Sequence, residues 1–331
     1  MHPKRNEYIP QLLFTELLSS SDCGTDAKEN GCGAKLTNIF SNEFTIESSD
    51  PKNMKKYRQT FAHNMTVKNP PIITDIRKKE AWTKVTFEPD LSRFSLTRLD
   101  EGMVDLIRKR TYDMAGVLGG KKTKVYFNGA RIKVNNFQEY LDLYLGPRSL
   151  DKPRVYERLN DCWEVCVAPS DGDTMQQVAF VNSICTSRGG SHVHHVLKQI
   201  SDKLVKDAGQ TTREKGCINP ARIRNRYWVF LNCWIDNPWF DSQTKDILVS
   251  HVSTFGSRCE ITDKFMKKLE KSGILDAGIE PRGKQTPEKT VGKAGLAQCC
   301  EFVFSICPFS FFSFFSLGVE CTPGAGKGKA S

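Results

Sequence analysis

The sequence comprises 331 residues with a formal net charge of +10, and 39% of them are hydrophobic and 26% charged. This length predicts one to three domains, and this composition predicts that they bury ordinary hydrophobic cores. The charge favours a polyanion as partner only weakly because it is spread along the chain, and the first six residues lack an apolar segment, so no secretory signal is expected.

Twelve cysteines are present, and no two of them have the Cys-x-x-Cys spacing of common metal sites. Several lie inside predicted strands, where a thiol packs as a small apolar group. We therefore expect reduced, buried thiols in a nuclear or cytosolic protein.

The first predicted element is a short amphipathic helix over residues 8–18, followed by a polar segment. Residues 30–35, Asn-Gly-Cys-Gly-Ala-Lys, then lead into a second helix that carries Leu36, Ile39 and Phe40. Two glycines directly before a helix let backbone N–H groups close on an anion, and the helix N-terminus adds partial positive charge. Taken alone, such a Gly-x-Gly pattern is more often a tight loop before a helix.

Alternating apolar residues predict three strands, over 43–47, 57–61 and 83–87. Apolar residues at helical spacing predict a helix over 99–117. Asn128-Gly129 is the strongest short signal for a β-hairpin. We expect all of these elements to contribute hydrophobic core.

The polar, proline-containing stretch over 152–158 predicts a domain boundary. Beyond it, strands are predicted over 163–168, 178–184 and 226–235, with a helix that begins near Ser191 between the last two. A strand–helix–strand unit of this length predicts a right-handed βαβ crossover. The last strand is apolar on both faces, which predicts that it is buried on both.

A polar loop, Pro238-Trp239-Phe240-Asp241-Ser242-Gln243-Thr244-Lys245, follows this strand. A loop at the end of a stiff strand can aim the amide of Gln243 and the ammonium of Lys245 at a ligand. A surface turn with a solvated lysine is the commoner interpretation of such a loop taken alone.

Four strings, in one order along the chain, together resemble the eukaryotic type IIA DNA topoisomerases. These strings are Leu-Leu-Ser-Ser-Ser with Asn-Gly-Cys-Gly-Ala-Lys-Leu within 17–36, Trp-Thr-Lys-Val-Thr-Phe-Glu-Pro-Asp-Leu at 82–91, Phe-Val-Asn-Ser-Ile-Cys-Thr-Ser-Arg-Gly-Gly-Ser-His-Val at 180–193, and Asn-Pro-Trp-Phe-Asp-Ser-Gln-Thr-Lys at 237–245. The resemblance implies an α+β fold in which 1–152 form the C-terminal part of a GHKL-type ATPase α/β sandwich. Residues 153–278 would form a transducer domain with the βαβ crossover, and 279–331 a tail unrelated to the family.

The resemblance also implies an ATP site shared by an ATP lid and the loop after the last strand. In the family, Gln243 and Lys245 correspond to residues that reach from the transducer to the γ-phosphate of ATP, so they are the expected catalytic residues. The implied ATP-binding residues are Ser20, Ser21, Asp22, Lys28, Glu29, Asn30, Gly31, Cys32, Gly33, Ala34, Lys35, Gln243, Thr244 and Lys245. Asp22 stands where the family usually has Asn, and Lys28-Glu29 stands where it has Gly-Arg.

The family's reaction is ATP-dependent passage of one DNA duplex through another, which relaxes and decatenates DNA. It implies ATP and Mg²⁺ as cofactors, double-stranded DNA as partner, a homodimer and location in the nucleus. The strings that carry the family's glutamate base, Mg²⁺-binding asparagine and cleavage tyrosine do not occur in this sequence. We therefore expect no metal ligand in this chain. Loss of a positioned base lowers a rate by about 10²- to 10⁴-fold, so we expect this chain alone to hydrolyse ATP poorly or not at all.

The alternative is an inactive remnant that acts at most as a DNA-binding or dimerisation module. By the resemblance, Lys206, Arg213 and Lys215 approach the captured DNA, although a solvated loop is equally consistent with their spacing. A metal cluster at His192, His194 and His195 is disfavoured, because on a helix 192 and 195 are the neighbours and no third ligand stands at a suitable spacing beside them.

From residue 280 the chain departs from the family, and 296–319 are rich in Phe, Ser and Cys. This stretch is long enough to span a bilayer, but Glu301, Pro308 and several serines disfavour a membrane helix. Its common residues have pyrimidine-rich codons. We hypothesise that 299–317 are translated from a polypyrimidine tract, such as the end of a retained intron, and we expect no membrane partner.

Overall fold

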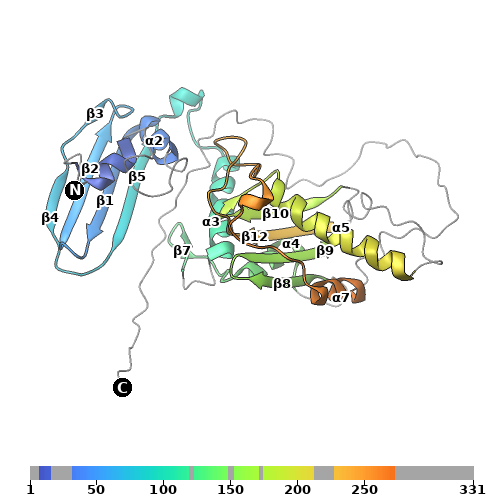
Figure 1. Cartoon of the computed structure of the whole chain (residues 1–331). Coiled ribbons are helices and arrows are strands. Elements are labelled where there is room, and N and C mark those ends of the chain that lie inside the picture. The colour runs from blue at the N-terminus through green and yellow to red at the C-terminus, as the bar shows by residue number, and fades with distance from the viewer. Residues whose placement is uncertain are drawn as a thin grey trace, which may run out of the picture. The chain divides into compact units, whose positions relative to one another are not determined.

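The computed structural model describes residues 7–15, 32–118, 123–147, 153–170, 174–211 and 227–272 (Figure 1). The fold is α+β, and the chain divides into two compact units. Among the described residues, the first unit comprises 7–111 and 123–132, and the second comprises 112–118 and 133–272. This division rests on spatial proximity, and the family-based boundary at residue 152 stays a prediction.

The first unit is built on a five-stranded antiparallel sheet. Its strands are β1 (Ser41–Asp50), β2 (Lys55–Ala62), β3 (Val67–Lys68), β4 (Ile72–Asp75) and β5 (Trp82–Pro89). The order is β3-β2-β1-β5, with β4 also paired to β2. Phe44 of β1 stands opposite Phe61 of β2 and Phe87 of β5. The three strands predicted in this half of the chain are confirmed, and each is longer than predicted.

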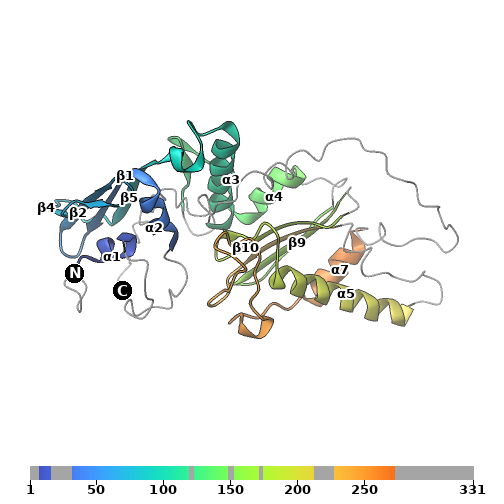
Figure 2. The ribbon, with the colours of Figure 1, turned by 90° about the horizontal axis from the view of Figure 1, so that it is seen from above.

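Two short helices cover one face of this sheet, as Figure 2 shows. They are α1 (Ile9–Thr15) and α2 (Cys32–Ile39). The core between helices and sheet contains Phe44, Ile46, Tyr57 and Phe61, with Tyr8 and Phe14 packed against it. Asn38 of α2 is fully buried and donates from Nδ2 to the carbonyl of Phe14 at 3.2 Å, which ties the two helices together.

A 3-10 helix (Leu91–Phe94) leads from β5 towards α3 (Glu101–Leu118), which confirms the predicted long helix. A hairpin follows, formed by β6 (Tyr126–Phe127) and β7 (Ala130–Arg131). Its two turn residues are Asn128 and Gly129, with φ of 48° and 77°. Asn and Gly tolerate this left-handed conformation, so the predicted hairpin is confirmed.

The second unit contains a mixed five-stranded sheet. Its strands are β8 (Val155–Asn160), β9 (Trp163–Pro169), β10 (Gln176–Val181), β11 (Ile184–Cys185) and β12 (Tyr227–Cys233). The order is β11-β10-β12-β9-β8, and β10 and β12 are parallel, with α5 (Ser191–Thr211) between them in sequence. The βαβ unit predicted from the sequence is therefore present. The predicted strand over 178–184 is wrong in its second half, because Asn182 and Ser183 have φ of 51° and 67° and turn the chain into β11.

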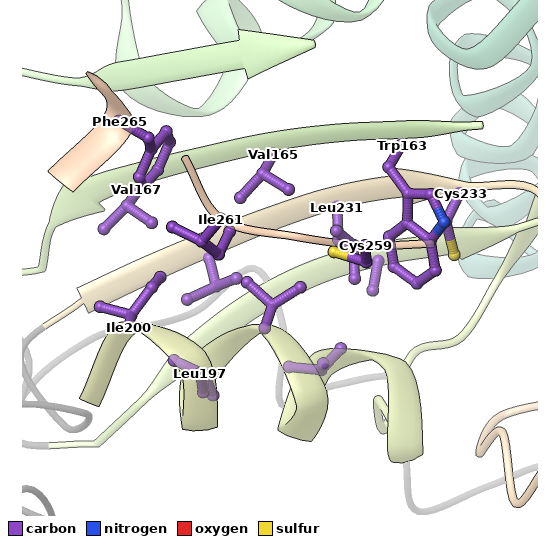
Figure 3. Close-up of a cluster of buried hydrophobic side chains, with 14 of the residues drawn as sticks. Trp163, Val165, Val167, Leu197, Ile200, Leu231, Cys233, Cys259, Ile261 and Phe265 are labelled. Carbon is purple, nitrogen blue, oxygen red and sulfur yellow. The ribbon is translucent and has the colours of Figure 1, made fainter. Parts of the chain in front are cut away.

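Helices cover both faces of this second sheet (Figures 1 and 2). On one face, α5 and α7 (Asp263–Lys271) enclose the core shown in Figure 3, where Leu197 and Ile200 of α5 meet Val165 and Leu231 of the sheet. On the other face, α4 (Phe137–Leu145) sets its Phe137 and Tyr140 rings against Phe180. Central strand β12 is therefore buried on both faces, as predicted.

Candidate functional site

The loop that follows β12 carries the predicted catalytic pair within one tight turn, 242–245, which we name the switch turn. The backbone amide of Lys245 donates to the carbonyl of Ser242 at 3.1 Å. Lys245 has φ of 60°, a conformation that is uncommon for a side-chain-bearing residue. Its side chain is only 8% exposed, with Nζ 5.6 Å from the centroid of the Phe240 ring. This lysine is not the solvated side chain of an ordinary surface turn.

Asp241 closes the base of the switch turn. Its amide donates to the carbonyl of Ile247 at 3.1 Å, and its Oδ1 accepts from the amide of Ile247 at 3.3 Å. The same Oδ1 accepts from the hydroxyl of Ser242 at 3.0 Å. The two bonds between Asp241 and Ile247 hold the ends of the segment together, so Gln243 and Lys245 lie within a closed loop.

Gln243 supplies a hydrogen-bond donor that no described residue of the chain accepts from. Its Nε2 is buried and has no hydrogen-bond partner among the residues that the structure describes. A buried amide nitrogen without an acceptor is unfavourable by about 1–3 kcal/mol, so such groups in folded proteins generally meet a partner. A phosphate oxygen would satisfy this donor, and the neighbouring lysine would supply a positive charge beside it.

A second turn, 186–190, is bonded to the segment that follows the switch turn, and we name it the glycine turn. The amide of Leu248 donates to the carbonyl of Gly189 at 3.0 Å, and the amide of Ser191 donates to the carbonyl of Leu248 at 2.9 Å. Gly190 has φ of 135°, and a Cβ there would lie 2.3 Å from the carbonyl oxygen of Leu248. The segment that directly follows the string at 237–245 thus lies beside the string at 180–193.

The histidines that follow the glycine turn serve the structure. His192 is fully buried, and its Nε2 lies 3.0 Å from the hydroxyl of Thr186. Burial lowers the pKa of His192 to about 3, so the ring is neutral at physiological pH. His195 Nε2 lies 3.2 Å from the carbonyl of Cys259. Within the described part of the chain, no three His, Cys, Asp or Glu side chains are placed to hold one metal ion.

The predicted lid residues are described only in part. Ser20, Ser21, Asp22, Lys28, Glu29, Asn30 and Gly31 lie outside the described residues. Cys32, Gly33, Ala34 and Lys35 form the first turn of α2, and the carbonyl of Gly33 accepts from the hydroxyl of Thr37 at 2.9 Å. Gly33 is therefore inside the helix, and the prediction that both glycines precede it is wrong. Helix α2 belongs to the first unit and the switch turn to the second.

Two further predictions lie at or beyond the edge of the described residues. Arg213 and Lys215, the possible DNA contacts, are outside them, and of Lys206 only the backbone is described. The tail over 279–331, including the hypothetical translated intron, is also outside. Over the ranges that the structure does describe, no helix is both long and apolar enough to cross a bilayer.

The sequence did not indicate the roles of two polar residues in the second unit. Asp246 accepts hydrogen bonds from Thr244 and from Ser187 of the glycine turn. Asn182 bonds reciprocally to the backbone of Ile235, donating from Nδ2 at 2.8 Å and accepting at Oδ1 at 2.9 Å. Asn is tolerant of a left-handed backbone, and this was the one available signal for a turn at Asn182. Asp246 had none beyond its position next to Lys245.

Known proteins match this chain closely. A family model described as DNA gyrase B matches residues 134–280. DNA topoisomerase 2 of Arabidopsis thaliana is 46% identical over 286 residues, which cover 83% of this chain and 19% of that protein. The chain therefore spans about a fifth of the length of such relatives.

Two solved structures extend the match to the fold. The ATPase region of Saccharomyces cerevisiae topoisomerase II has 41% identity and a TM-score of 0.74, over 83% of this chain and 71% of that one. The ATPase and transducer domains of DNA topoisomerase II from Balamuthia mandrillaris have 36% identity and a TM-score of 0.74, over the same shares of 83% and 71%. With the four strings, the fold and the switch turn in agreement, the chain belongs to the DNA topoisomerase II family.

Proposed function

We propose that this chain is the ATPase-gate and transducer segment of an ATP-dependent type II DNA topoisomerase, which passes one duplex through another in the nucleus. The chain spans 19% of its Arabidopsis relative, so strand passage, relaxation and decatenation are proposed for an enzyme that includes this segment. Double-stranded DNA and a second copy of the enzyme are the proposed partners.

The observation that carries this proposal is the buried Nε2 of Gln243, which has no hydrogen-bond partner among the described residues, in the same turn as the buried Lys245. A cation and a neutral donor side by side suit the charge on the terminal phosphate of ATP, which grows during phosphoryl transfer. In the proposed role, Lys245 neutralises that charge and Gln243 donates to a phosphate oxygen. The string that carries the family's magnesium ligand does not occur in this sequence.

The proposed coupling of ATP to gate movement rests on where the switch turn is attached. The switch turn lies in the loop after β12, the central strand of the second unit. Leu248, just beyond the turn, is bonded to the glycine turn that precedes α5. A force on Lys245 would therefore reach the sheet and α5 through short, hydrogen-bonded connections. We propose that binding of ATP tilts this unit and so closes a protein gate.

The competing proposal is an inactive remnant that at most binds DNA or dimerises. Its support is that Asp22 stands where the family usually has Asn, and that Lys28-Glu29 stands where the family has Gly-Arg. Under this proposal, Lys206, Arg213 and Lys215 could still contact DNA phosphates without turnover.

Strand passage in a chimaera tests the two proposals against each other. The segment of Saccharomyces cerevisiae topoisomerase II that matches this chain is replaced by residues 7–272, and ATP-dependent decatenation is measured. The active proposal predicts decatenation that Lys245→Ala abolishes without loss of DNA binding. Lys198→Ala is the matched control, because Lys198 pairs with Asp202 on the surface of α5. A soluble, DNA-binding chimaera without decatenation supports the remnant.

A further inference from the structure

We infer that Asp246 is a positioning residue that binds the switch turn to the glycine turn and so holds Lys245 in place. We name the contacts of Asp246 with Thr244 and Ser187 the latch. The inference rests on the proposed function for its purpose, because Lys245 is the side chain being positioned. The latch itself is a property of the hydrogen bonds around one carboxylate, and it can be tested without nucleotide.

Asp246 binds both turns at once. Its Oδ2 accepts from the hydroxyl of Thr244 at 2.5 Å, and its Oδ1 accepts from the hydroxyl of Ser187. Its backbone carbonyl accepts from the amide of Arg188 at 3.0 Å. One carboxyl oxygen therefore serves each turn, and hydrogen bonds to an ionised group are the stronger kind.

The left-handed backbone conformation of Lys245 is unfavourable for a lysine and has to be held by other contacts. Its φ of 60° lies in the left-handed region, which a lysine does not favour by itself. Thr244 on one side and Asp246 on the other are joined by a hydrogen bond across this residue. The carboxylate thus restrains the strained turn and ties it to Ser187, a residue 59 positions away that no local propensity would bring there.

The latch is separate from the contacts that hold the fold. Leu248 remains bonded to Gly189 and Ser191 through backbone atoms whatever side chain stands at position 246. Loss of the carboxylate should therefore loosen the switch turn while the sheet and α5 stay folded. A held turn presents Lys245 and Gln243 in a fixed geometry before any ligand arrives, which is what a preorganised phosphate contact requires.

The test measures acylation of Lys245 by an amine-reactive reagent in the full chain, together with hydrogen exchange of the Lys245 and Ile247 amides, both by mass spectrometry. We expect Asp246→Ala to raise the Lys245 acylation rate and both exchange rates by about tenfold, the equivalent of one hydrogen bond. Ser187→Ala should act in the same direction, and Ser187→Thr, which keeps the hydroxyl, should restore the native rates. Asp202→Ala is the control, because Asp202 is an exposed carboxylate of the same unit paired with Lys198.

Unchanged acylation and exchange in Asp246→Ala and Ser187→Ala would overturn the latch. If Asp246→Ala does not fold, as judged by circular dichroism, the pair Ser187→Ala and Ser187→Thr decides alone, because Ser187 is exposed. Equal rates in that pair overturn the latch, and faster rates only in Ser187→Ala support it. Failure of the proposed function has a different signature, namely nucleotide binding that does not depend on Lys245.

Discussion

The amide of Leu248 donates a hydrogen bond to the carbonyl oxygen of Gly189 at 3.0 Å, and this bond joins two loops that lie 59 residues apart. One loop follows β12, and the other follows β11, which runs back antiparallel to β10. The pairing of Leu248 with Gly189 therefore fixes where the switch turn can act.

Substitution of Gly190 should disrupt this pairing. Its φ of 135° disfavours any side chain, and a Cβ would lie 2.3 Å from the carbonyl oxygen of Leu248, which is backbone and cannot rotate away. We expect Gly190→Ala to lower the free energy of unfolding by at least about 2 kcal/mol, measured by urea denaturation. Gly129→Ala is the control, because Gly129 has φ of 77° but no atom within 4 Å of the added Cβ. Equal losses in the two variants would show that the close approach of Leu248 is unimportant.

The second unit also depends on a close approach between α3 and α4. A Cβ at Gly116 would lie 2.6 Å from Cγ of the buried Tyr140 ring. We expect Gly116→Ala to destabilise the chain by about 1–3 kcal/mol, the usual effect of overpacking a core. Gly102→Ala in the same helix meets only Asp100 Oδ1 at 3.4 Å, and should be neutral or stabilising by up to about 1 kcal/mol. A neutral Gly116→Ala in the same urea titration would contradict this packing.

His192 should make the stability of the chain depend on pH. Burial lowers its pKa from 6.5 to about 3, so below pH 6.5 the unfolded chain gains a proton that the folded chain does not. The stability associated with neutral His192 is present above pH 6.5 and is lost as the pH falls towards 3. Between pH 7 and pH 5 this loss amounts to about 2 kcal/mol.

The variant His192→Gln separates this effect from other titrating groups. Gln cannot take up a proton, yet it can still bond to the hydroxyl of Thr186, which lies 3.0 Å from His192 Nε2. Urea denaturation of both proteins at pH 7 and pH 5 should show a smaller loss of stability for the variant. Identical losses would mean that His192 is protonated in the folded chain.

Much of this fold could be predicted because local signals and burial agree. Apart from Asn232, the residues on both faces of β12 are apolar, so burial on both sides follows from the pattern alone. Asn128-Gly129 specified its hairpin for an equally local reason. The break at Asn182 was missed because the residues around it, from Val178 to Ile184, have the β propensity of one continuous strand.

The candidate site was only partly predictable for a different reason. Gln243 and Lys245 stood out through the family resemblance, and their closeness in one turn follows from their spacing. Asp246 and Ser187 meet only after β10 and β12 have paired, and no periodicity of the sequence encodes that contact. Residues whose role depends on a long-range contact therefore escape an analysis of local pattern.

The most direct test of the central claim compares the binding of a non-hydrolysable ATP analogue with that of ADP by isothermal titration of this chain. If Gln243 and Lys245 hold the terminal phosphate, the analogue should bind about 10- to 100-fold more tightly than ADP, the usual worth of a charge-assisted contact. Lys245→Ala should remove this preference and leave ADP binding unchanged, while Lys198→Ala should alter neither. Equal affinities of the native chain for the two nucleotides, or a preference that survives Lys245→Ala, would contradict the account.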